Sequence, residues 1–210
     1  MPLGVFADRA SRGRPVTTES PRQTLERQQY VVIRSAIAQP LLGFLWRYVL
    51  ERAQSGALQP IERDVTAAPG AYGDPVMEHV LERLRPSAEA LTGVPLYPTY
   101  SYLRLYTHGD ALASHRDRPA CEFSLSLTLG QEPPVPWPLW IRGPAGAHAA
   151  RLEPGDALLY RGMECEHWRE PYGGLRLAQV FLHYVNQTGP HAAWKFDRRD
   201  SLGLTVPLPI

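Results

Sequence analysis

The sequence of 210 residues has little of several features that mark specialised proteins. Its two cysteines, Cys121 and Cys165, are too few for a disulfide framework. The net charge of +1 argues against a nucleic-acid footprint and against an acidic tail. No apolar run approaches the ~18 residues of a membrane-spanning helix, because Arg47 ends the best one, residues 41–46. The charged residues of the first segment, 1–15, are not followed by an apolar stretch, so no secretory signal is expected there.

What remains is the composition of an ordinary globular protein, with 44% hydrophobic and 20% charged residues. This length suggests one domain, which we expect to be cytoplasmic. The sequence predicts a flexible N-terminal arm over 1–25, a single folded domain over 26–190 and a C-terminal tail over 191–210. Of the 22 basic residues only Lys195 is a lysine, so any single arginine is weak evidence of function.

The spacing of apolar residues changes from a helical to a strand period along the chain. After a short strand at 30–33, helices are expected from Pro40 to just before Gly56 and over 75–91, where Pro86 should kink or break the helix. Further strands are expected at 99–106, 121–129, 138–142, 149–152, 157–160 and 175–185. Helices followed by many short strands indicate an α+β, mainly β fold, a sandwich or barrel with helices packed outside it.

Two histidines and one aspartate form the most informative pattern. His115 and Asp117 stand two residues apart, so on an extended segment both side chains leave the same face. His167 follows 50 residues after Asp117, beyond a predicted strand and a Pro-Gly-Asp turn. Two imidazoles and one carboxylate match the facial triad of non-haem Fe(II) oxygenases, which leaves coordination positions open for a co-substrate and dioxygen.

An arginine follows the second histidine by nine residues. The segment 170–174 has the composition of a hairpin turn, which would bring His167 opposite Arg176 or Leu177 on the next strand. A guanidinium beside a metal suits a ligand with two anionic ends, one of which would chelate iron while the other pairs with Arg176.

In these residues and their spacing, the sequence resembles the Fe(II)/2-oxoglutarate-dependent oxygenases, specifically their prolyl 4-hydroxylase-like branch. The matching segments are 105–109, 115–117, 152–160, His167-Trp168 and Arg176, and the resemblance covers roughly 30–186. The sequence departs from that branch in the proline-rich stretch 131–138, where a compact glycine-rich turn is common. Prolyl substrates are therefore not assumed.

The resemblance implies a double-stranded β-helix (jelly-roll) core with the N-terminal helices packed outside. It also implies that His115, Asp117 and His167 are the catalytic iron ligands. Arg176 would pair with the distal carboxylate of 2-oxoglutarate, and Tyr106 would hydrogen-bond the same group. Such enzymes use Fe(II), 2-oxoglutarate and O2, with ascorbate as an optional reductant, and release succinate and CO2.

The resemblance further implies an oxidised substrate, most simply by hydroxylation of an unactivated C–H bond in a small metabolite, amino acid or peptide. The presence of Asp117 favours oxygen transfer over halogenation, because the related halogenases lack that carboxylate. Desaturation, epimerisation and ring formation use the same ligands and stay open.

Strand parity adds candidates for the substrate pocket. Tyr102 and Arg104 share a face with Tyr106, so we predict that they bind the substrate. The polar face of the strand at 121–129 points either into the site or into solvent, and its period alone does not decide between them. The sequence predicts no nucleic-acid or membrane partner and leaves the oligomeric state and the substrate unidentified.

The alternative interpretation of the same residues is a non-catalytic function. A jelly roll can retain a metal and a carboxylate ligand for structure or sensing alone, as a binding module. The joint presence of the metal triad and Arg176 argues against this alternative, because a scaffold needs neither.

Two further patterns are weaker. The motif at 115–117 also spells the catalytic loop of kinases, but Glu122 stands where that motif has asparagine and no glycine-rich loop precedes it. Cys165 and His167 could begin a zinc site, but only Cys121 remains as a further thiol, so a small buried thiol is the better interpretation.

Overall fold

A computed structural model describes residues 19–60, 66–134 and 137–203. Its helices and helical turns are α1 (Pro21–Gln28), α2 (Gln39–Gln54), α3 (Pro75–Thr92), η1 (Pro119–Cys121) and η2 (Ala192–Arg198). Its strands are β1 (Tyr30–Ile33), β2 (Gly70–Tyr72), β3 (Leu96–Thr107), β4 (Leu112–His115), β5 (Phe123–Glu132), β6 (Leu139–Gly143), β7 (Gly146–Ala150), β8 (Ala157–Arg161), β9 (Glu166–Arg169) and β10 (Arg176–Asn186).

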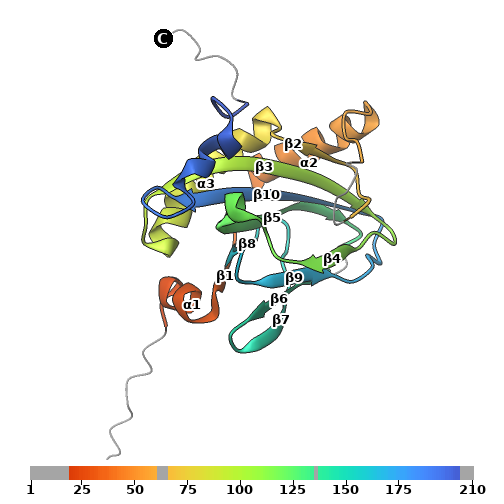
Figure 1. The fold of residues 1–210 in the computed structure, drawn as a ribbon. Coiled ribbons are helices and arrows are strands. Elements are labelled where there is room, and N and C mark those ends of the chain that lie inside the picture. Colours follow the sequence, from red (N-terminus) through yellow and green to blue (C-terminus); the bar gives the residue numbers. More distant parts are fainter. Residues whose placement is uncertain (1–18, 61–65, 135–136, 204–210) are drawn as a thin grey trace, which may run out of the picture.

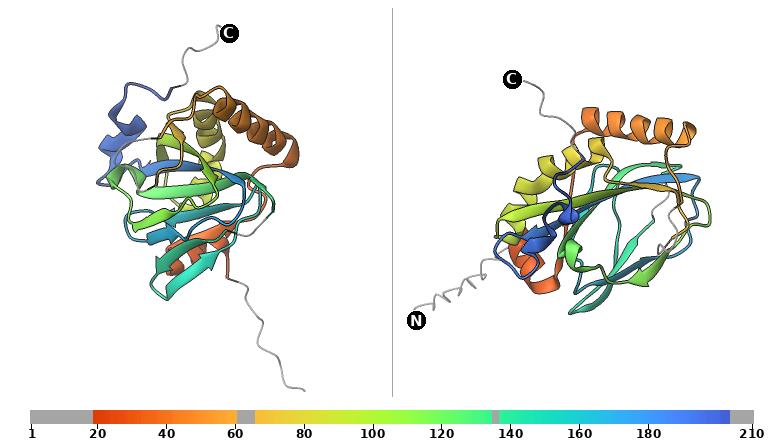
Figure 2. Two further views of the ribbon diagram at one scale, coloured as in Figure 1. Left: turned by 90° about the vertical axis from the view of Figure 1, so that its right-hand side faces the viewer. Right: turned by 45° about the horizontal axis from the view of Figure 1, so that its top comes forward.

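Two antiparallel sheets face each other. The larger sheet has the strand order β1-β8-β5-β10-β3-β2, and the smaller has the order β4-β9-β6-β7. Helices α2 and α3 cover the larger sheet on the side away from the smaller one (Figure 1), and the views of Figure 2 show the same arrangement from two other directions. The predicted fold, a mainly β jelly roll with N-terminal helices outside, is confirmed.

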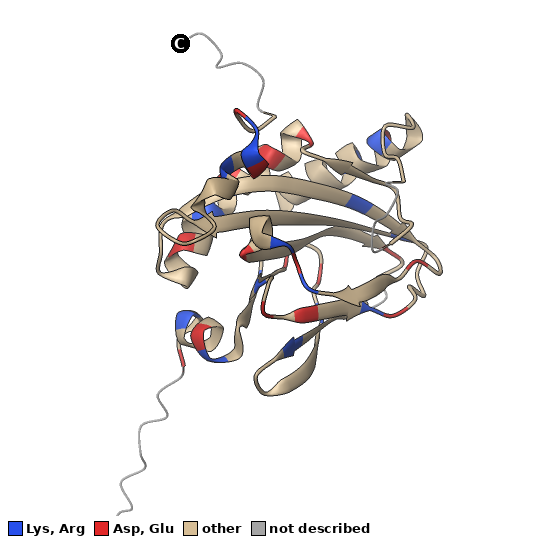
Figure 3. Cartoon of the chain, viewed as in Figure 1, with Lys and Arg blue, Asp and Glu red and all other residues tan. Residues whose placement is uncertain are grey.

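The alternation of side chains on the long central strands separates two environments. On the outer face, Leu103, Leu125 and Val180 are fully buried against α2 and α3, which contribute Leu45 and Leu81. Fully burying such a side chain contributes roughly 1.5–3 kcal/mol, so the larger sheet and its helices form a stable wall. Side chains that alternate with these along the strands face the space between the sheets. Strands β3 and β10, which form part of that wall, carry few charged residues (Figure 3).

The helices begin and end at residues suited to those positions. Asp74 caps α3 by accepting hydrogen bonds from the backbone of Val76 and Met77, and Gly93 ends it with a left-handed φ of 73°. Helix α3 continues through Pro86 to its last residue, so the predicted break does not occur there. None of the helices in the described parts of the chain has the length and apolar content needed to cross a membrane.

Both chain ends differ from the predicted arm and tail where the structure describes them. Ser20 and Gln23 form a capping box at the start of α1, and Leu25 is 1% exposed, so this part of the predicted arm is a packed helix. At the other end, buried Glu78 accepts hydrogen bonds from Arg199 and from the backbone of Gly203. The rest of both predictions, 1–18 and 204–210, lies outside the described residues.

Candidate metal centre

A cavity of about 340 Å³ opens between the two sheets. Its walls come from β2, β3, β8 and β10 of the larger sheet and from β4 and β9 of the smaller one. Tyrosines make up much of the lining, and the three predicted metal ligands, His115, Asp117 and His167, lie together in it.

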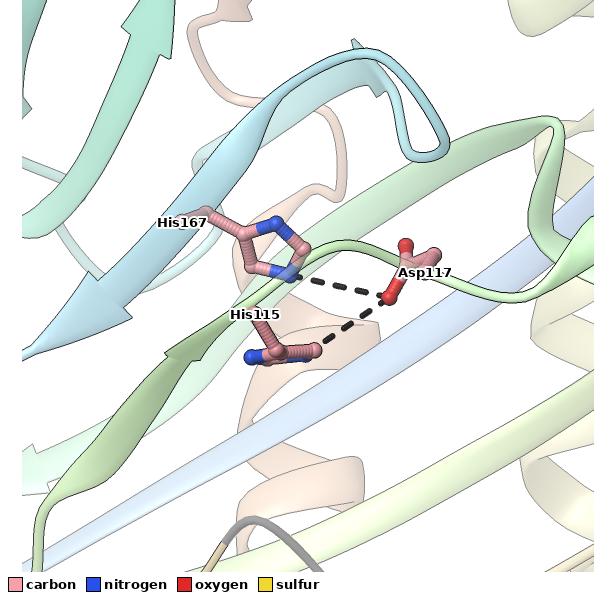
Figure 4. Close-up of side chains that lie close together, drawn as sticks. All are labelled: His115, Asp117 and His167. Atoms are coloured by element: carbon pink, nitrogen blue, oxygen red, sulfur yellow. Dashed lines mark ion pairs between the residues drawn. The ribbon is translucent and has the colours of Figure 1, made fainter.

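The two histidines are direct cross-strand neighbours. His115 at the end of β4 pairs with His167 on β9, and their ring centroids lie 4.2 Å apart. Asp117 follows β4 by two residues and places Oδ1 3.7 Å from His115 Nε2 and 3.6 Å from His167 Nε2 (Figure 4). Three ligand atoms from two separate parts of the chain thus point at one another, as a metal site requires.

Hydrogen bonds fix which nitrogen of each ring faces the cavity. Nδ1 of His115 lies 2.8 Å from the carbonyl of Ala113, and Nδ1 of His167 lies 3.0 Å from the carbonyl of Cys165. A carbonyl only accepts, so each Nδ1 carries the proton and each Nε2 keeps its lone pair for a metal. Burial lowers the pKa of His167 below its ordinary value, which favours the neutral ring that coordination needs.

A small residue and a hydroxyl position the carboxylate. The backbone N–H of Asp117 donates to the carbonyl of Gly162, and a Cβ at Gly162 would collide with Oδ2 of Asp117. Ser124 donates to that Oδ2 over 2.7 Å, which leaves Oδ1 directed at the imidazoles. Nδ1 of His183 lies 2.9 Å from Ser124 Oγ and donates to it, because the hydroxyl proton is already committed to Asp117.

His183 and Ser124 were not predicted as site residues. Burial lowers the pKa of His183 to about 4, so its ring is neutral at pH 7 and supports Asp117 through the hydroxyl. The possible ligand atoms of Asp117, Cys121 and His183 also lie close together. However, the Tyr100 hydroxyl lies 3.1 Å from the Cys121 sulfur, and burial raises the pKa of the Cys121 thiol. The neutral thiol and the engaged His183 make this second group a poorer metal site than the first.

Arg176 does not reach the cavity. The hairpin prediction is wrong, because β9 belongs to the smaller sheet and β10 to the larger, so His167 pairs with His115 and Ile141 instead. On β10, Arg176 lies on the same face of the strand as Ala178 and Val180, which pack toward the helices. Its guanidinium donates to Glu132 over 2.7 Å, at the start of the strand.

A different arginine enters the space between the sheets. Arg169 lies two residues after His167 on β9 and is 2% exposed. Burial lowers its pKa to about 10, so the guanidinium stays positively charged at pH 7. Tyr106, which the resemblance implied as a co-substrate contact, is fully buried in the same region, and its hydroxyl finds no hydrogen-bond partner among the described residues.

The predicted substrate residues do line the cavity. Tyr102 and Arg104 both contribute to its wall, with the Arg104 guanidinium 4.4 Å from the centre of the Tyr102 ring. Burial, assisted by the neighbouring Tyr106, raises the pKa of Tyr102 to about 12. Trp137 of the proline-rich stretch is 7% exposed and packs between Tyr106, which it meets edge on, and the tilted ring of Tyr172, so it belongs to the interior and not to the rim.

No family model matches the sequence, and no curated protein matches it either. Solved structures are similar at the level of the fold. EctD from S. alaskensis in its apo form has a TM-score of 0.66 and 18% identity over 91% of this chain and 89% of that chain. The non-heme alpha ketoglutarate dependent epimerase SnoN from nogalamycin biosynthesis has a TM-score of 0.65 and 16% identity over 90% of each chain.

A third similar structure is a Pseudomonas putida prolyl-4-hydroxylase, with a TM-score of 0.64 and 19% identity over 77% of this chain and 95% of that chain. EctD has been crystallised with Fe and with 2-oxoglutarate and 5-hydroxyectoine, and SnoN with Fe3+, alpha ketoglutarate and nogalamycin RO. The chain therefore has the fold of the Fe(II)/2-oxoglutarate-dependent oxygenases. Within it, a histidine–aspartate–histidine group lies in the cavity between the sheets.

Proposed function

We propose that this protein is an Fe(II)- and 2-oxoglutarate-dependent dioxygenase that hydroxylates an unactivated C–H bond. The observation that carries the proposal is the convergence of His115 Nε2, His167 Nε2 and Asp117 Oδ1, with both Nδ1 atoms committed to backbone carbonyls. This donor set suits Fe(II), and three protein ligands would leave coordination positions free for a co-substrate. When bound, the iron and its co-substrate supply the oxidising chemistry.

The chain's own residues would hold and shield these groups. Ser124 and His183 fix the carboxylate of Asp117, as the hydrogen bonds above require. The hydroxyl of Tyr160 donates to His167 Nε2 over 3.3 Å, a hydrogen bond that a bound metal would replace. Tyrosines and Phe181 on the larger sheet give the cavity an apolar wall, which excludes water from the reacting C–H bond.

The size and lining of the cavity favour a small molecule. A volume of about 340 Å³ is at the low end for ligand sites. Tyr72 and Tyr100 stack with their ring centroids 5.0 Å apart, and the Arg104 guanidinium lies over Tyr102. Flat apolar surfaces beside a cation fit an amphipathic metabolite or amino acid, and EctD, which has a similar fold, was crystallised with 5-hydroxyectoine. We place the protein in the cytoplasm.

The direct test is succinate release from 2-oxoglutarate with Fe(II), ascorbate and O2. We expect slow release without the substrate, and faster release with an accepted substrate that gains one oxygen atom by mass spectrometry. Asp117→Ala and His167→Ala should each abolish both release and Fe(II) binding in an anaerobic titration, because each removes one of only three ligands.

His148→Ala is the matched control, because His148 is exposed and stacks on Tyr30 away from the cavity. It should behave as the wild type. If the wild type binds Fe(II) and 2-oxoglutarate but releases no succinate with any candidate substrate, the protein is a non-catalytic binding module and the proposed function is wrong.

A further inference from the structure

The C-terminal segment, residues 187–199, is attached to the rest of the molecule at both of its ends. Where the segment leaves β10, the side-chain amide of Gln187 donates to the carbonyl of Leu96 over 3.0 Å. At its far end, the Arg199 guanidinium donates over 2.6 Å to the carboxylate of Glu78, which is completely buried. These bonds join the segment to β3 and α3, so a movement of the residues between them leaves both ends in place.

Between these two attachments, the segment is held by one carboxylate. Asp197 accepts two hydrogen bonds from the Arg118 guanidinium, over 2.8 and 2.7 Å, and one from the Tyr72 hydroxyl over 2.6 Å. None of the residues of η2 is buried, so little apolar burial adds to these bonds. A segment with few buried apolar contacts opens locally at a lower free energy than the core does.

The backbone at this contact is strained. Phe196, Asp197 and Arg198 have φ of 52°, 56° and 63° in succession. Residues with a Cβ rarely adopt this left-handed conformation, and such strain persists only where the surroundings impose it. Here the bonds to Asp197 impose it, so their loss lets the backbone relax away from its present position.

The segment covers one side of the cavity between the sheets. Tyr72 and Arg118, which hold it, both line that cavity. Trp194 of η2 packs against the cluster that contains Tyr100 and Cys121, two further lining residues. The Arg118 guanidinium lies 4.7 Å from the Tyr100 ring centre and 5.5 Å from that of Trp194. The segment therefore closes the cavity on the side of Cys121.

We propose that the C-terminal segment is a lid on the cavity, fastened by the contact of Asp197 with Arg118 and Tyr72, which opens to admit the substrate. This inference rests on the proposed function, because an oxidation site between two sheets needs both an entrance and protection from water. Since His115 and His167 lie on the smaller sheet, opening of the lid leaves the metal ligands in place.

The test uses the two cysteines as reporters of access. Cys121 lines the cavity, whereas Cys165 is buried outside the lining with its sulfur 3.6 Å from the carbonyl of Gln29. The protein is treated with N-ethylmaleimide without added metal or co-substrate, and mass spectrometry of its peptides gives the labelling rate of each thiol. In Asp197→Asn, Cys121 should react at least about tenfold faster than in the wild type, while the rate at Cys165 stays unchanged.

Two further variants separate the opening of the lid from the effect of charge on the thiol. Burial raises the pKa of Cys121, the charge of Asp197 adds to this rise and the charge of Arg118 opposes it. Because the thiolate is the reactive form, loss of the Arg118 charge alone would slow the labelling of Cys121. Arg118→Met also unfastens the lid and should instead speed labelling by at least about threefold. Tyr72→Phe changes no charge and should speed it by about threefold.

Glu19→Gln is the matched control. Glu19 also accepts two hydrogen bonds from one guanidinium, that of Arg27, over 2.8 and 2.7 Å. Neither residue lines the cavity. The loss of this ion pair should leave both labelling rates at their wild-type values.

The lid is contradicted if Asp197→Asn speeds the labelling of Cys121 while Arg118→Met slows it, since charge alone gives that pattern. Unchanged labelling in all three variants also overturns the proposal. So does an equal acceleration at Cys121 and Cys165 in all three, which means lower stability of the whole chain. A wild type that releases no succinate contradicts the proposed function, and this result is independent of the labelling rates.

Discussion

At the scale of single residues, the proposed metal ligands depend on neighbours that leave no room for a larger side chain. Gly162 is the clearest case, because an added Cβ would meet both the Asp117 carboxylate and the carbonyl of Cys121. The carboxylate must then move away from the imidazoles, so Gly162→Ala should reduce Fe(II) affinity by about 10–100-fold. An anaerobic Fe(II) titration measures this loss.

Gly173→Ala serves as the control for that change. Nothing lies within 4 Å of a Cβ at Gly173, and its φ is not in the left-handed region, so the substitution adds the same methyl group without a clash. We expect wild-type Fe(II) affinity from it. If Gly162→Ala and the wild type bind Fe(II) with equal affinity, the space at Gly162 does not hold the Asp117 carboxylate in position for the metal.

The residue scale also shows what the sequence could reveal. His115 and Asp117 could be predicted because a spacing of two on an extended segment fixes a shared face, and the structure brings both together with His167. Arg169 could not be singled out, because the chain has many arginines and the sequence does not show which of them, such as Arg104 and Arg169, are buried. Tyr106 was indicated by resemblance alone.

At the scale of elements, the hairpin prediction that placed Arg176 beside His167 failed at the connection between two strands. The segment 170–174 has a hairpin composition, but it passes from the smaller sheet to the larger one, so β9 and β10 are not paired. Local composition reports a change of direction and not the sheet to which the next strand belongs. The long strands β3, β5 and β10 were predicted to within three residues at either end, whereas β2, β4 and β9, each of three or four residues, were not identified as strands.

The C-terminal segment is held at the rim of the cavity by one carboxylate. Asp197 in η2 accepts two hydrogen bonds from Arg118, over 2.8 and 2.7 Å, and one from Tyr72 over 2.6 Å. Both donors line the cavity. Burial alone would raise the pKa of Asp197, but the bonds from Arg118 and Tyr72 and the charges of Arg118 and Arg199 together lower it.

This lowered pKa gives a pH dependence with a definite sign. The contact stabilises the folded segment above the unfolded value of about 4 and is lost as the pH falls through the lower folded value. Asp197→Asn should reproduce the low-pH state at pH 7, because it removes the charge that Arg118 pairs with. Hydrogen exchange of residues 192–199 should rise in the variant at pH 7 and in the wild type only at acidic pH. Slow exchange in both at pH 7 would contradict this role.

At the scale of the whole molecule, the residues of the proposed site connect the two sheets. His115 and His167 belong to the smaller sheet, whereas Tyr102 on β3 and Phe181 on β10 line the same cavity from the larger one. Anything bound between these residues adds contacts that the unfolded chain does not have. Ligand binding should therefore raise the thermal stability of the entire chain.

The size of this rise follows from mass action. A ligand at 100 times its Kd adds about 2.7 kcal/mol to the free energy of unfolding, which for a protein of this length corresponds to about 5–11 °C in Tm. We expect one such rise with Fe(II) under anaerobic conditions and a second when 2-oxoglutarate is added. In Asp117→Ala both rises should disappear, because the carboxylate is one of the three proposed metal ligands and 2-oxoglutarate would chelate the bound metal. A retained rise with Fe(II) in that variant would contradict the proposed role of Asp117.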